Sequence, residues 1–154
     1  MKNVEQIFNE FLERYPLLLY LSDDIMSAYD IICDSYDNGG KVLACGNGGS
    51  AADSDHIVGE LMKGFISKRE LSKEEKEMFE GIDDAQKITS NLQGALPAIS
   101  LCSHSALMTA FLNDVAPDII FALQVWGYSR NSFDTLIALS TSGNSADVVN
   151  AVKV

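Results

Sequence analysis

Apolar residues recur at steps of three and four positions in the first part of the chain, with polar residues between them. This spacing predicts an amphipathic helix that ends near Pro16. Its apolar face consists of Val4, Ile7, Phe8, Phe11 and Leu12. We expect Ser22 to be the N-cap of a second helix, with Asp23 and Asp24 in its first turn. That helix should end at the turn sequence DNGG, residues 37–40.

Three later runs of apolar residues are short and are bounded by polar residues or glycine. They predict buried strands, KVLAC, LPAISLC and DTLIALS, at residues 41–45, 96–102 and 134–140. Helices are predicted at residues 50–64, 105–114 and 117–128, the last begun by Pro117, and from residue 146 onward. Short apolar strands that alternate with helices indicate an α/β fold, in which helices cover both faces of a parallel sheet.

A polar segment at residues 67–92 interrupts this alternation. Within it, Ser72 and Glu75 have the spacing of a capping box, so we expect an exposed helical insertion. Because a doubly wound sheet rarely ends after three strands, we also expect the chain to be a piece of a longer one. We treat residues 1–154 as one domain, with N-terminal helices at 1–38, a partial α/β sheet at 41–154, and the insertion.

Of the 154 residues, 47% are hydrophobic, which is enough for one domain with a buried core. The 22 acidic and 11 basic residues give a net charge of −11, which opposes binding to nucleic acids and to anionic membranes. We expect no transmembrane span, because the longest apolar runs are too short, and no signal peptide, because acidic residues occur where its apolar core would lie. Cys33, Cys45 and Cys102 are odd in number and widely spaced, which indicates reduced core thiols. We therefore expect a cytoplasmic protein.

Two predicted strands are followed by turns rich in glycine and serine, GNGGS at residues 46–50 and STSGNS at residues 140–145. Glycine lets the chain bend tightly, and the helix that follows presents unpaired N–H groups. Together with the serine hydroxyls, these groups predict a site for a small phosphorylated metabolite. Each turn alone is also consistent with a simple connection. GNGGS is no dinucleotide-binding motif, since Ala51 replaces the last glycine, and no P-loop, since no lysine follows.

Asp53, His56 and Glu60 share one face of the predicted helix at residues 50–64. A histidine and a carboxylate four residues apart suit a transition-metal site or acid–base catalysis. The same pair is also typical of a surface hydrogen bond, and two ligands leave a metal site incomplete. We interpret His104, the other histidine, as a structural residue near the start of a helix.

These motifs, in their order and strand context, resemble the sugar isomerase (SIS) domain of phosphoheptose isomerases. The resemblance rests on GKVLACGNGGSAADSDHIVGEL and LIALSTSGNSADVVNAVK, with LPAISL and AFLND between them. It implies a flavodoxin-like parallel sheet and a homotetramer built on the N-terminal helices. The implied reaction interconverts sedoheptulose 7-phosphate and a mannoheptose 7-phosphate through an enediol.

The resemblance also implies roles for individual residues. The sugar phosphate would be held by Ser50, Ser140, Thr141, Ser142 and Ser145. The sugar would be lined by Asn47, Gly48, Gly49 and Asp114. His56 and Glu60 would match metal ligands, commonly for zinc, and Glu60 would be the catalytic carboxylate that moves a proton between carbons 1 and 2.

The sequence departs from the family pattern in two places. The family's remaining metal ligands, a Gln and a His, lie on a later helix that has no counterpart here, and the insertion at residues 67–92 exceeds the family's common form. Two alternatives therefore stay open. One is a non-catalytic SIS protein that binds a sugar phosphate or a protein partner as a regulator, and the other is a structural fragment. His56 and Glu60 favour the enzyme, because a binding module has no need of them.

Overall fold

The computed structural model describes residues 3–154. Its internal contacts divide the chain into two compact units, with the boundary between Asp34 and Ser35. None of the helices formed by the described residues is long and apolar enough to cross a membrane.

The N-terminal unit consists of helices, as the apolar spacing predicted. Helix α1 (Val4–Arg14) begins with a capping box in which the Gln6 amide donates to Asn3 Oδ1 at 2.8 Å. A 3₁₀ helix, η1 (Pro16–Leu21), then leads directly into α2 (Ser22–Asp37). The prediction of Ser22 as an N-cap is wrong, because its φ of −53° and ψ of −46° are already helical. The preceding 3₁₀ turn leaves no extended residue there, although the two aspartates do lie in the first turn.

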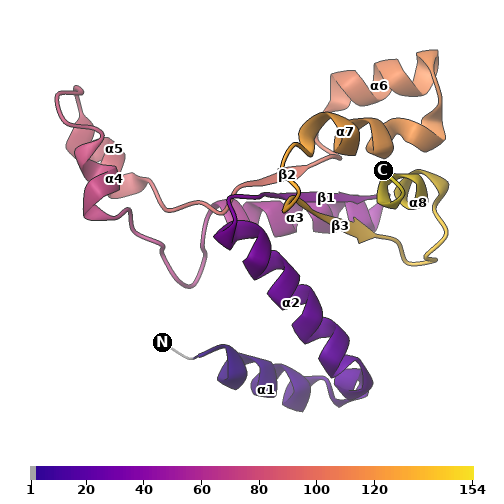
Figure 1. The fold of residues 1–154 in the computed structure, drawn as a ribbon, viewed down its shortest axis with the longest axis horizontal. Coiled ribbons are helices and arrows are strands. Elements are labelled where there is room, and N and C mark those ends of the chain that lie inside the picture. The colour runs from indigo at the N-terminus through magenta and orange to yellow at the C-terminus, as the bar shows by residue number, and fades with distance from the viewer. Residues whose placement is uncertain (1–2) are drawn as a thin grey trace. The chain divides into compact units, whose positions relative to one another are not determined.

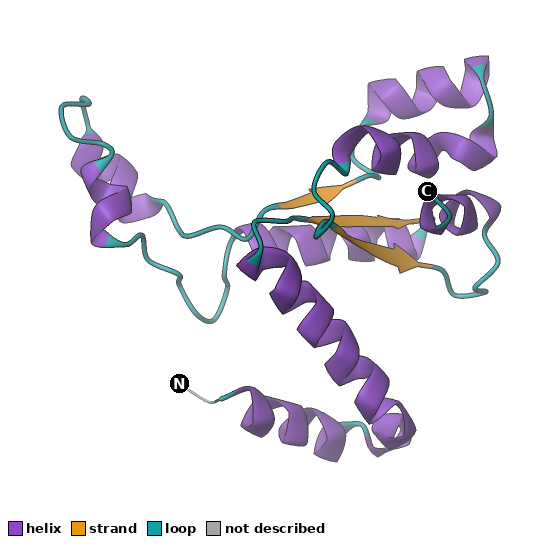
Figure 2. Ribbon diagram, in the orientation of Figure 1, coloured by secondary structure: helices purple, strands orange, loops and turns teal. Residues whose placement is uncertain are grey.

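The second unit is built on a sheet of three parallel strands in the order β2-β1-β3. These strands are β1 (Val42–Gly46), β2 (Ala98–Ser100) and β3 (Thr135–Leu139), shown in orange in Figure 2. Every residue of β1 is buried, as a central strand covered on both faces requires. The predicted parallel sheet is confirmed.

Helices cover both faces of this sheet (Figure 1). Leu43 and Cys45 of β1 pack into a core cluster with residues of α7 (Ile120–Tyr128) and α8 (Ala146–Val152). Alternate residues of a strand point to opposite faces, and α3 (Gly49–Met62) packs along the strands on the other face. Helix α6 (Ser105–Asp114) is followed by a 3₁₀ turn, η2 (Pro117–Ile119), so the segment begun by Pro117 becomes α-helical only at Ile120.

Asp134 fixes the start of β3 to the start of β1. Its carboxylate, with a side chain that is 1% exposed, accepts hydrogen bonds from the Lys41 amide at 3.0 Å and the Lys41 ammonium at 2.7 Å. The amides of Arg130 and Asn131 donate to the same carboxylate at 2.9 and 3.0 Å. Burial raises the pKa of Asp134, but these donors outweigh burial and lower the pKa to about 2.

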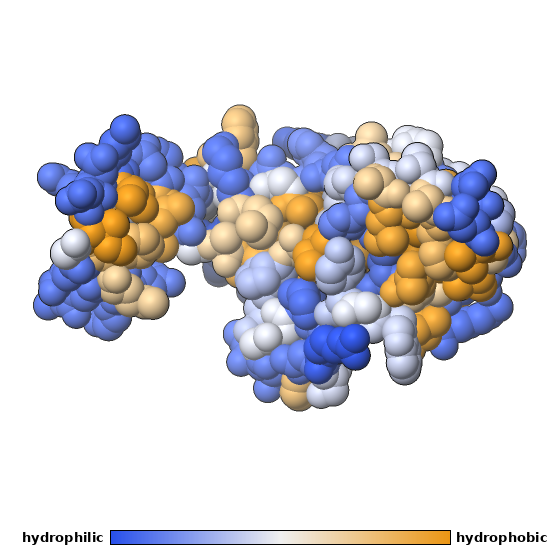
Figure 3. Space-filling model, turned by 90° about the horizontal axis from the view of Figure 1, so that it is seen from above, coloured by the Kyte–Doolittle hydropathy of each residue, from blue (hydrophilic) through white to orange (hydrophobic). Residues whose placement is uncertain are grey.

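The predicted insertion forms two short helices, α4 (Lys73–Glu77) and α5 (Ala85–Asn91), at the end of two connecting segments (Figure 1). The predicted capping box is present, since the Glu75 amide donates to Ser72 Oγ at 3.1 Å and Glu75 Oε2 accepts from the Ser72 amide at 2.7 Å. In Figure 3, hydrophilic residues surround apolar ones on this insertion.

Arg69 closes the base of the insertion. The Gly94 amide donates to the Arg69 carbonyl at 2.6 Å, and Arg69 Nε donates to the Gly94 carbonyl at 2.7 Å. The same guanidinium donates to the carbonyl of Leu61 in the last turn of α3. The insertion therefore leaves and re-enters the body of this unit at one point.

Candidate functional site

Both glycine–serine turns lie at the same edge of the sheet. Strands β1 and β3 are parallel neighbours, and their last residues, Gly46 and Leu139, are register partners. The chain leaves β1 toward β2 on one side, whereas β3 lies on the other side, so the strand order reverses here. Ligands of open α/β sheets bind at such a reversal, outside the carboxyl ends of the strands.

The first turn depends on glycine at two positions. Gly48 has a φ of 57° with a ψ of −119°, a conformation that disfavours residues with a side chain. A Cβ on Gly46 would lie 2.7 Å from Ser50 Cβ, so only glycine lets the first turn of α3 approach the strand. The Ser50 amide donates to the Asn47 carbonyl at 3.0 Å, and residues 47–49 are exposed. The turn thus offers an exposed backbone at the start of a helix.

The second turn gathers serine hydroxyls. Ser140 Oγ lies 3.1 Å from Ser145 Oγ and 3.4 Å from Ser142 Oγ. Gly143, with a φ of 67°, makes the sharp bend that brings the turn back on itself. Thr141 is exposed beside them. Three of the four hydroxyls expected to hold phosphate in this turn therefore form one connected group.

Asn47 and Asp147 join the two turns. Asn47 Nδ2 donates to Asp147 Oδ1 and Oδ2, each at 3.0 Å. Asp147 lies in the first turn of α8 and was not among the residues predicted from the sequence. The two residues are 100 positions apart, so no local pattern pairs them. The pairing confirms that the two turns lie side by side, and it brings a carboxylate next to the expected phosphate site.

Cys45 lies one residue before the first turn. Burial, followed by the neighbouring Cys102 and Asp147, raises the pKa of its thiol to about 12. This thiol therefore stays protonated and carries no nucleophilic chemistry at neutral pH. All three cysteines are free, but only Cys45 is fully buried, while Cys33 and Cys102 are half-buried.

His56 and Glu60 are exposed on α3, four residues apart, and Asp53 is exposed three residues before His56. Within residues 3–154, the side chains of His56 and Glu60 form no hydrogen bond or ion pair, so both are available to a ligand. The described residues contain no group of three or more His, Cys, Asp or Glu side chains that would hold a metal ion. The pair therefore supplies one nitrogen and one carboxylate donor.

Asp55 faces the carboxyl end of β2 rather than this pair. Its carboxylate accepts hydrogen bonds from the hydroxyls of Ser100 and Ser103, and these bonds lower its pKa, partly offset by burial. A cavity of about 550 Å³ borders it, beside His104. The His104 ring stacks on Tyr128 with 5.5 Å between ring centroids, which agrees with its interpretation as a structural residue at the start of α6.

Asp114 is the one predicted sugar contact that the described residues do not bring to either turn. It is the last residue of α6, is exposed, and accepts a hydrogen bond from Asn113 Nδ2 at 2.7 Å. Its role stays a prediction from the family resemblance.

Comparison with known proteins identifies relatives of the chain. A family model described as the SIS domain matches residues 8–100. Phosphoheptose isomerases from Pelodictyon phaeoclathratiforme and Dechloromonas aromatica are 38% identical over 128 residues and 37% identical over 129 residues. These alignments cover 83% and 84% of this chain but 50% and 53% of the relatives. The chain thus spans about half the length of the curated relatives it matches.

Solved structures give the same result. The structure of phosphoheptose isomerase GmhA from Neisseria gonorrhoeae matches 97% of this chain and 66% of its own, with a TM-score of 0.66 and 31% identity. A phosphoheptose isomerase from Francisella tularensis matches 99% of this chain and 69% of its own, with a TM-score of 0.65 and 27% identity. The resemblance indicated by the two turn motifs is confirmed.

Proposed function

The chain belongs to the SIS domain family, and on this basis we propose that it is part of a phosphosugar isomerase. The reaction proposed is the interconversion of sedoheptulose 7-phosphate and a mannoheptose 7-phosphate. One observation carries the proposal. The glycine turn after β1 and the serine turn after β3 meet at one sheet edge, at the start of the helix that bears His56 and Glu60.

The phosphate would bind between the two turns. The hydroxyls of Ser140, Ser142 and Ser145 already form one group, Thr141 lies between the first two in the chain, and Ser50 belongs to the other turn. Hydroxyls and backbone amides bind phosphate without a positive side chain. Asn47, Gly48 and Gly49 would line the sugar, and Asp114 is retained as a sugar contact. The carboxylate of Asp147 would be kept from the phosphate by its bonds to Asn47.

Glu60 would carry the proton. A carboxylate at neutral pH only accepts hydrogen bonds, so it can take the proton from the carbon next to the carbonyl of the sugar. The enediol would form as the carbonyl oxygen gains a proton. Glu60 would then return its proton to the former carbonyl carbon while the neighbouring hydroxyl loses its own, so that one proton has moved between the carbons and one between the oxygens, which exchanges aldose and ketose. The base must lie within hydrogen-bond reach of both carbons, which are adjacent atoms of the substrate.

The described residues fit a metal only in part. His56 and Glu60 are unengaged donors of the types that zinc prefers, but a catalytic zinc usually takes three protein ligands. A divalent metal such as zinc would be held by these two residues together with at least one further ligand, and would polarise the substrate oxygens when bound. The proton transfer proposed for Glu60 takes place between Glu60 and the substrate, with no step on the metal.

An assay of heptose phosphate isomerisation tests the proposal in the protein that contains this chain. Glu60→Gln keeps the size of the side chain but removes the base, so turnover should fall by about 10²–10⁴-fold. Glu80→Gln, an equal change of charge on the insertion, is the matched control and should leave turnover unchanged. Parental turnover in Glu60→Gln would exclude the mechanism.

Ligand binding tests the phosphate site separately. Ser140→Ala combined with Ser142→Ala removes two hydroxyls, each worth roughly 1.5–3 kcal/mol when it bonds a charged group. Binding of sedoheptulose 7-phosphate, measured by calorimetry, should weaken by at least about tenfold, while Ser132→Ala, at an exposed residue before β3, should not change it. An unchanged affinity in the double variant would show that the phosphate lies elsewhere.

A second candidate function is a non-catalytic SIS protein that binds a sugar phosphate or a protein partner as a regulator. The observation that favours it is the joined pair of turns, which would hold a phosphate without the use of a base. That function predicts ligand binding that depends on Ser140 and Ser142, with no turnover in the parent. The two experiments above therefore separate the enzyme from the regulator.

We further propose a homo-oligomer, most simply a homotetramer, that assembles through the N-terminal unit. Helices α1 and α2 enclose an open apolar groove of about 290 Å³ in that unit, lined by Ile7, Phe8, Phe11 and Tyr29 among others. Ile7 is 56% exposed, and a second copy would bury it. The free cysteines and the charge of −11 favour a cytoplasmic protein without a nucleic acid partner.

A further inference from the structure

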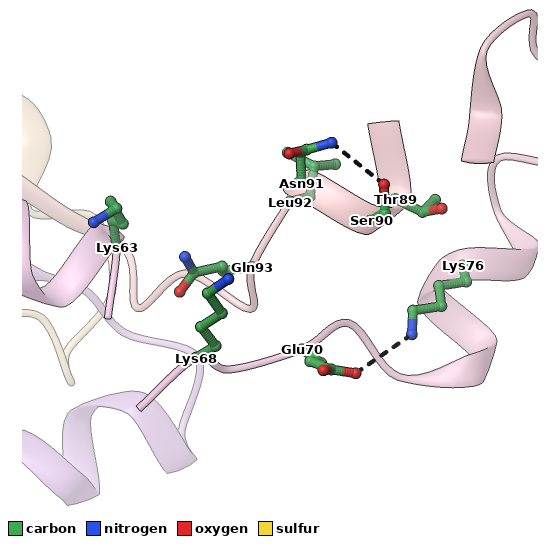
Figure 4. Close-up of a pocket in the computed structure, with 9 residues that line it drawn as sticks. All are labelled: Lys63, Lys68, Glu70, Lys76, Thr89, Ser90, Asn91, Leu92 and Gln93. Carbon is green, nitrogen blue, oxygen red and sulfur yellow. Dashed lines mark hydrogen bonds and ion pairs between the residues drawn. The ribbon is translucent and has the colours of Figure 1, made fainter. Parts of the chain in front are cut away.

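The insertion forms a cavity that neither turn contributes to. Its volume is about 470 Å³, within the range of small-molecule sites. One wall comes from the segment that enters the insertion, and the other from α5 and the segment that leaves it (Figure 4). The bonds of Arg69 to Gly94 hold the two segments together at the base. These hydrogen bonds therefore hold the two walls of the cavity together at its base.

Positive charge gathers on the first wall. Lys63, Lys68 and Lys76 line the cavity in a chain whose net charge is −11. Only one of the seven acidic residues in the segment 67–92, Glu70, lines it as well. Glu70 Oε2 lies 3.9 Å from Lys76 Nζ, and the side chains of Glu70 and Lys76 are 83% and 44% exposed, so this ion pair is weak. Two or more ammonium groups are thus available to an anion.

The second wall offers acceptors instead. The hydroxyl of Thr89 donates to the Ala85 carbonyl at 2.9 Å, and that of Ser90 donates to the Lys87 carbonyl at 3.1 Å. Both protons are therefore engaged by the backbone, and the Ser90 oxygen also accepts from Asn91 Nδ2 at 3.3 Å, so each oxygen keeps at least one lone pair for a ligand. Gln93 Oε1 is buried and has no hydrogen-bond partner within the described residues. A buried acceptor without a partner costs free energy that a donor on a ligand would recover.

From these two walls we infer that the cavity is a binding site for a phosphorylated sugar, separate from the two turns. The phosphate would bind the lysines, and the sugar hydroxyls would donate to Gln93, Ser90 and Thr89. No aromatic side chain lines the cavity, so a nucleobase would find no ring to stack on. Lys63 is the C-cap of α3, so the ligand would also contact the end of the helix that carries Glu60.

The test is a titration of ¹⁵N-labelled protein with glucose 6-phosphate and, separately, with inorganic phosphate, followed by NMR. Backbone amides of residues 68–93 report this cavity, and those of residues 47–50 and 140–145 report the turns. We expect glucose 6-phosphate to shift the first set and to bind there about tenfold more tightly than inorganic phosphate, because its sugar hydroxyls bring donors to Gln93 and the second wall while its phosphate occupies the lysines. Equal affinity of the two probes, or no shift of the first set at millimolar ligand, would overturn the inference.

Substitutions test separately the lysines, which would bind the phosphate, and Gln93, which would bind the sugar. Lys63→Gln with Lys68→Gln should weaken both probes at the cavity by about tenfold or more. Lys73→Gln with Lys87→Gln removes the same charge from lysines outside the cavity and should change binding less than twofold. Gln93→Leu should remove the preference for glucose 6-phosphate and leave inorganic phosphate unchanged. Equal weakening by both lysine pairs would mean that the anion is attracted by the overall charge of the insertion rather than bound in the cavity, and would contradict the proposal. The NMR spectra show directly that each variant is folded.

Discussion

At the scale of single residues, Asn47 and Asp147 decide how closely the two turns approach each other. Both hydrogen bonds from Asn47 Nδ2 end on the same carboxylate, whose Oδ1 also accepts from the Val148 amide at 3.0 Å, so removal of either partner loses the same pair of bonds. We expect Asn47→Ala and Asp147→Ala each to lower the free energy of unfolding by about 1 kcal/mol. The double variant should lose no more than either single variant, as urea denaturation would show.

The control for this cycle is Asp147→Asn, which keeps one acceptor oxygen and should recover part of the loss. Additive effects of the two alanine substitutions would mean that the contact between Asn47 and Asp147 contributes nothing to stability.

The contact between Asn47 and Asp147 could not be predicted from the sequence. Glycine and serine after a strand carry a local signal, whereas Asp147 is important only because β3 pairs with β1.

At the scale of elements, the start of β3 depends on Asp134, whose folded-state pKa is about 2 against an ordinary value of 3.8. A depressed pKa stabilises the folded state above the ordinary value, and the contribution is lost as the pH falls from about 4 to about 2. The shift corresponds to about 2 kcal/mol. We expect the free energy of unfolding, measured by denaturant titration, to fall over this interval.

Asp134→Asn is the comparison for this pH dependence. It should be less stable than the parent at pH 7 by about 2 kcal/mol and should show a smaller loss between pH 4 and pH 2, while Glu80→Gln should follow the parent. Parallel curves for Asp134→Asn and the parent would contradict the assignment. The measurement separates this carboxylate from the other acidic residues of a chain with many of them.

Most elements could be predicted because their apolar residues follow a regular pattern. The five residues of β1 form one buried run, and the apolar residues of α1, which are not buried, recur at helical spacing along the groove of the N-terminal unit. The failures have local causes. Strand β2 stops at Ser100, earlier than predicted, because the chain turns there: the Ser103 amide donates to the Ser100 carbonyl, and the Leu101 carbonyl accepts from Gln124 Nε2. Ser22 has the composition of an N-cap, but η1 passes into α2 without a break.

At the scale of the whole molecule, the proposed assembly depends on the groove between α1 and α2. Ile7→Glu places a charge in this groove and should reduce the mass measured by light scattering at micromolar concentration from that of a tetramer to that of a smaller species. Met78→Glu, a similar change at an exposed residue of the insertion, is the matched control and should keep the parental mass. A monomeric parent would exclude the assembly.

The closure of the insertion by Arg69 and Gly94 has a consequence for how such a chain can change over evolutionary time. Because the segment begins and ends at one place, its length and content can vary while β1 and β2 keep their register. The hydrogen bonds of Arg69 to Gly94 and Leu61 fix the two ends of the insertion, and the residues between Arg69 and Gly94 can be exchanged without changing these bonds. New recognition can thus be added or removed beside the helix that carries Glu60 without redesigning the sheet that folds around it.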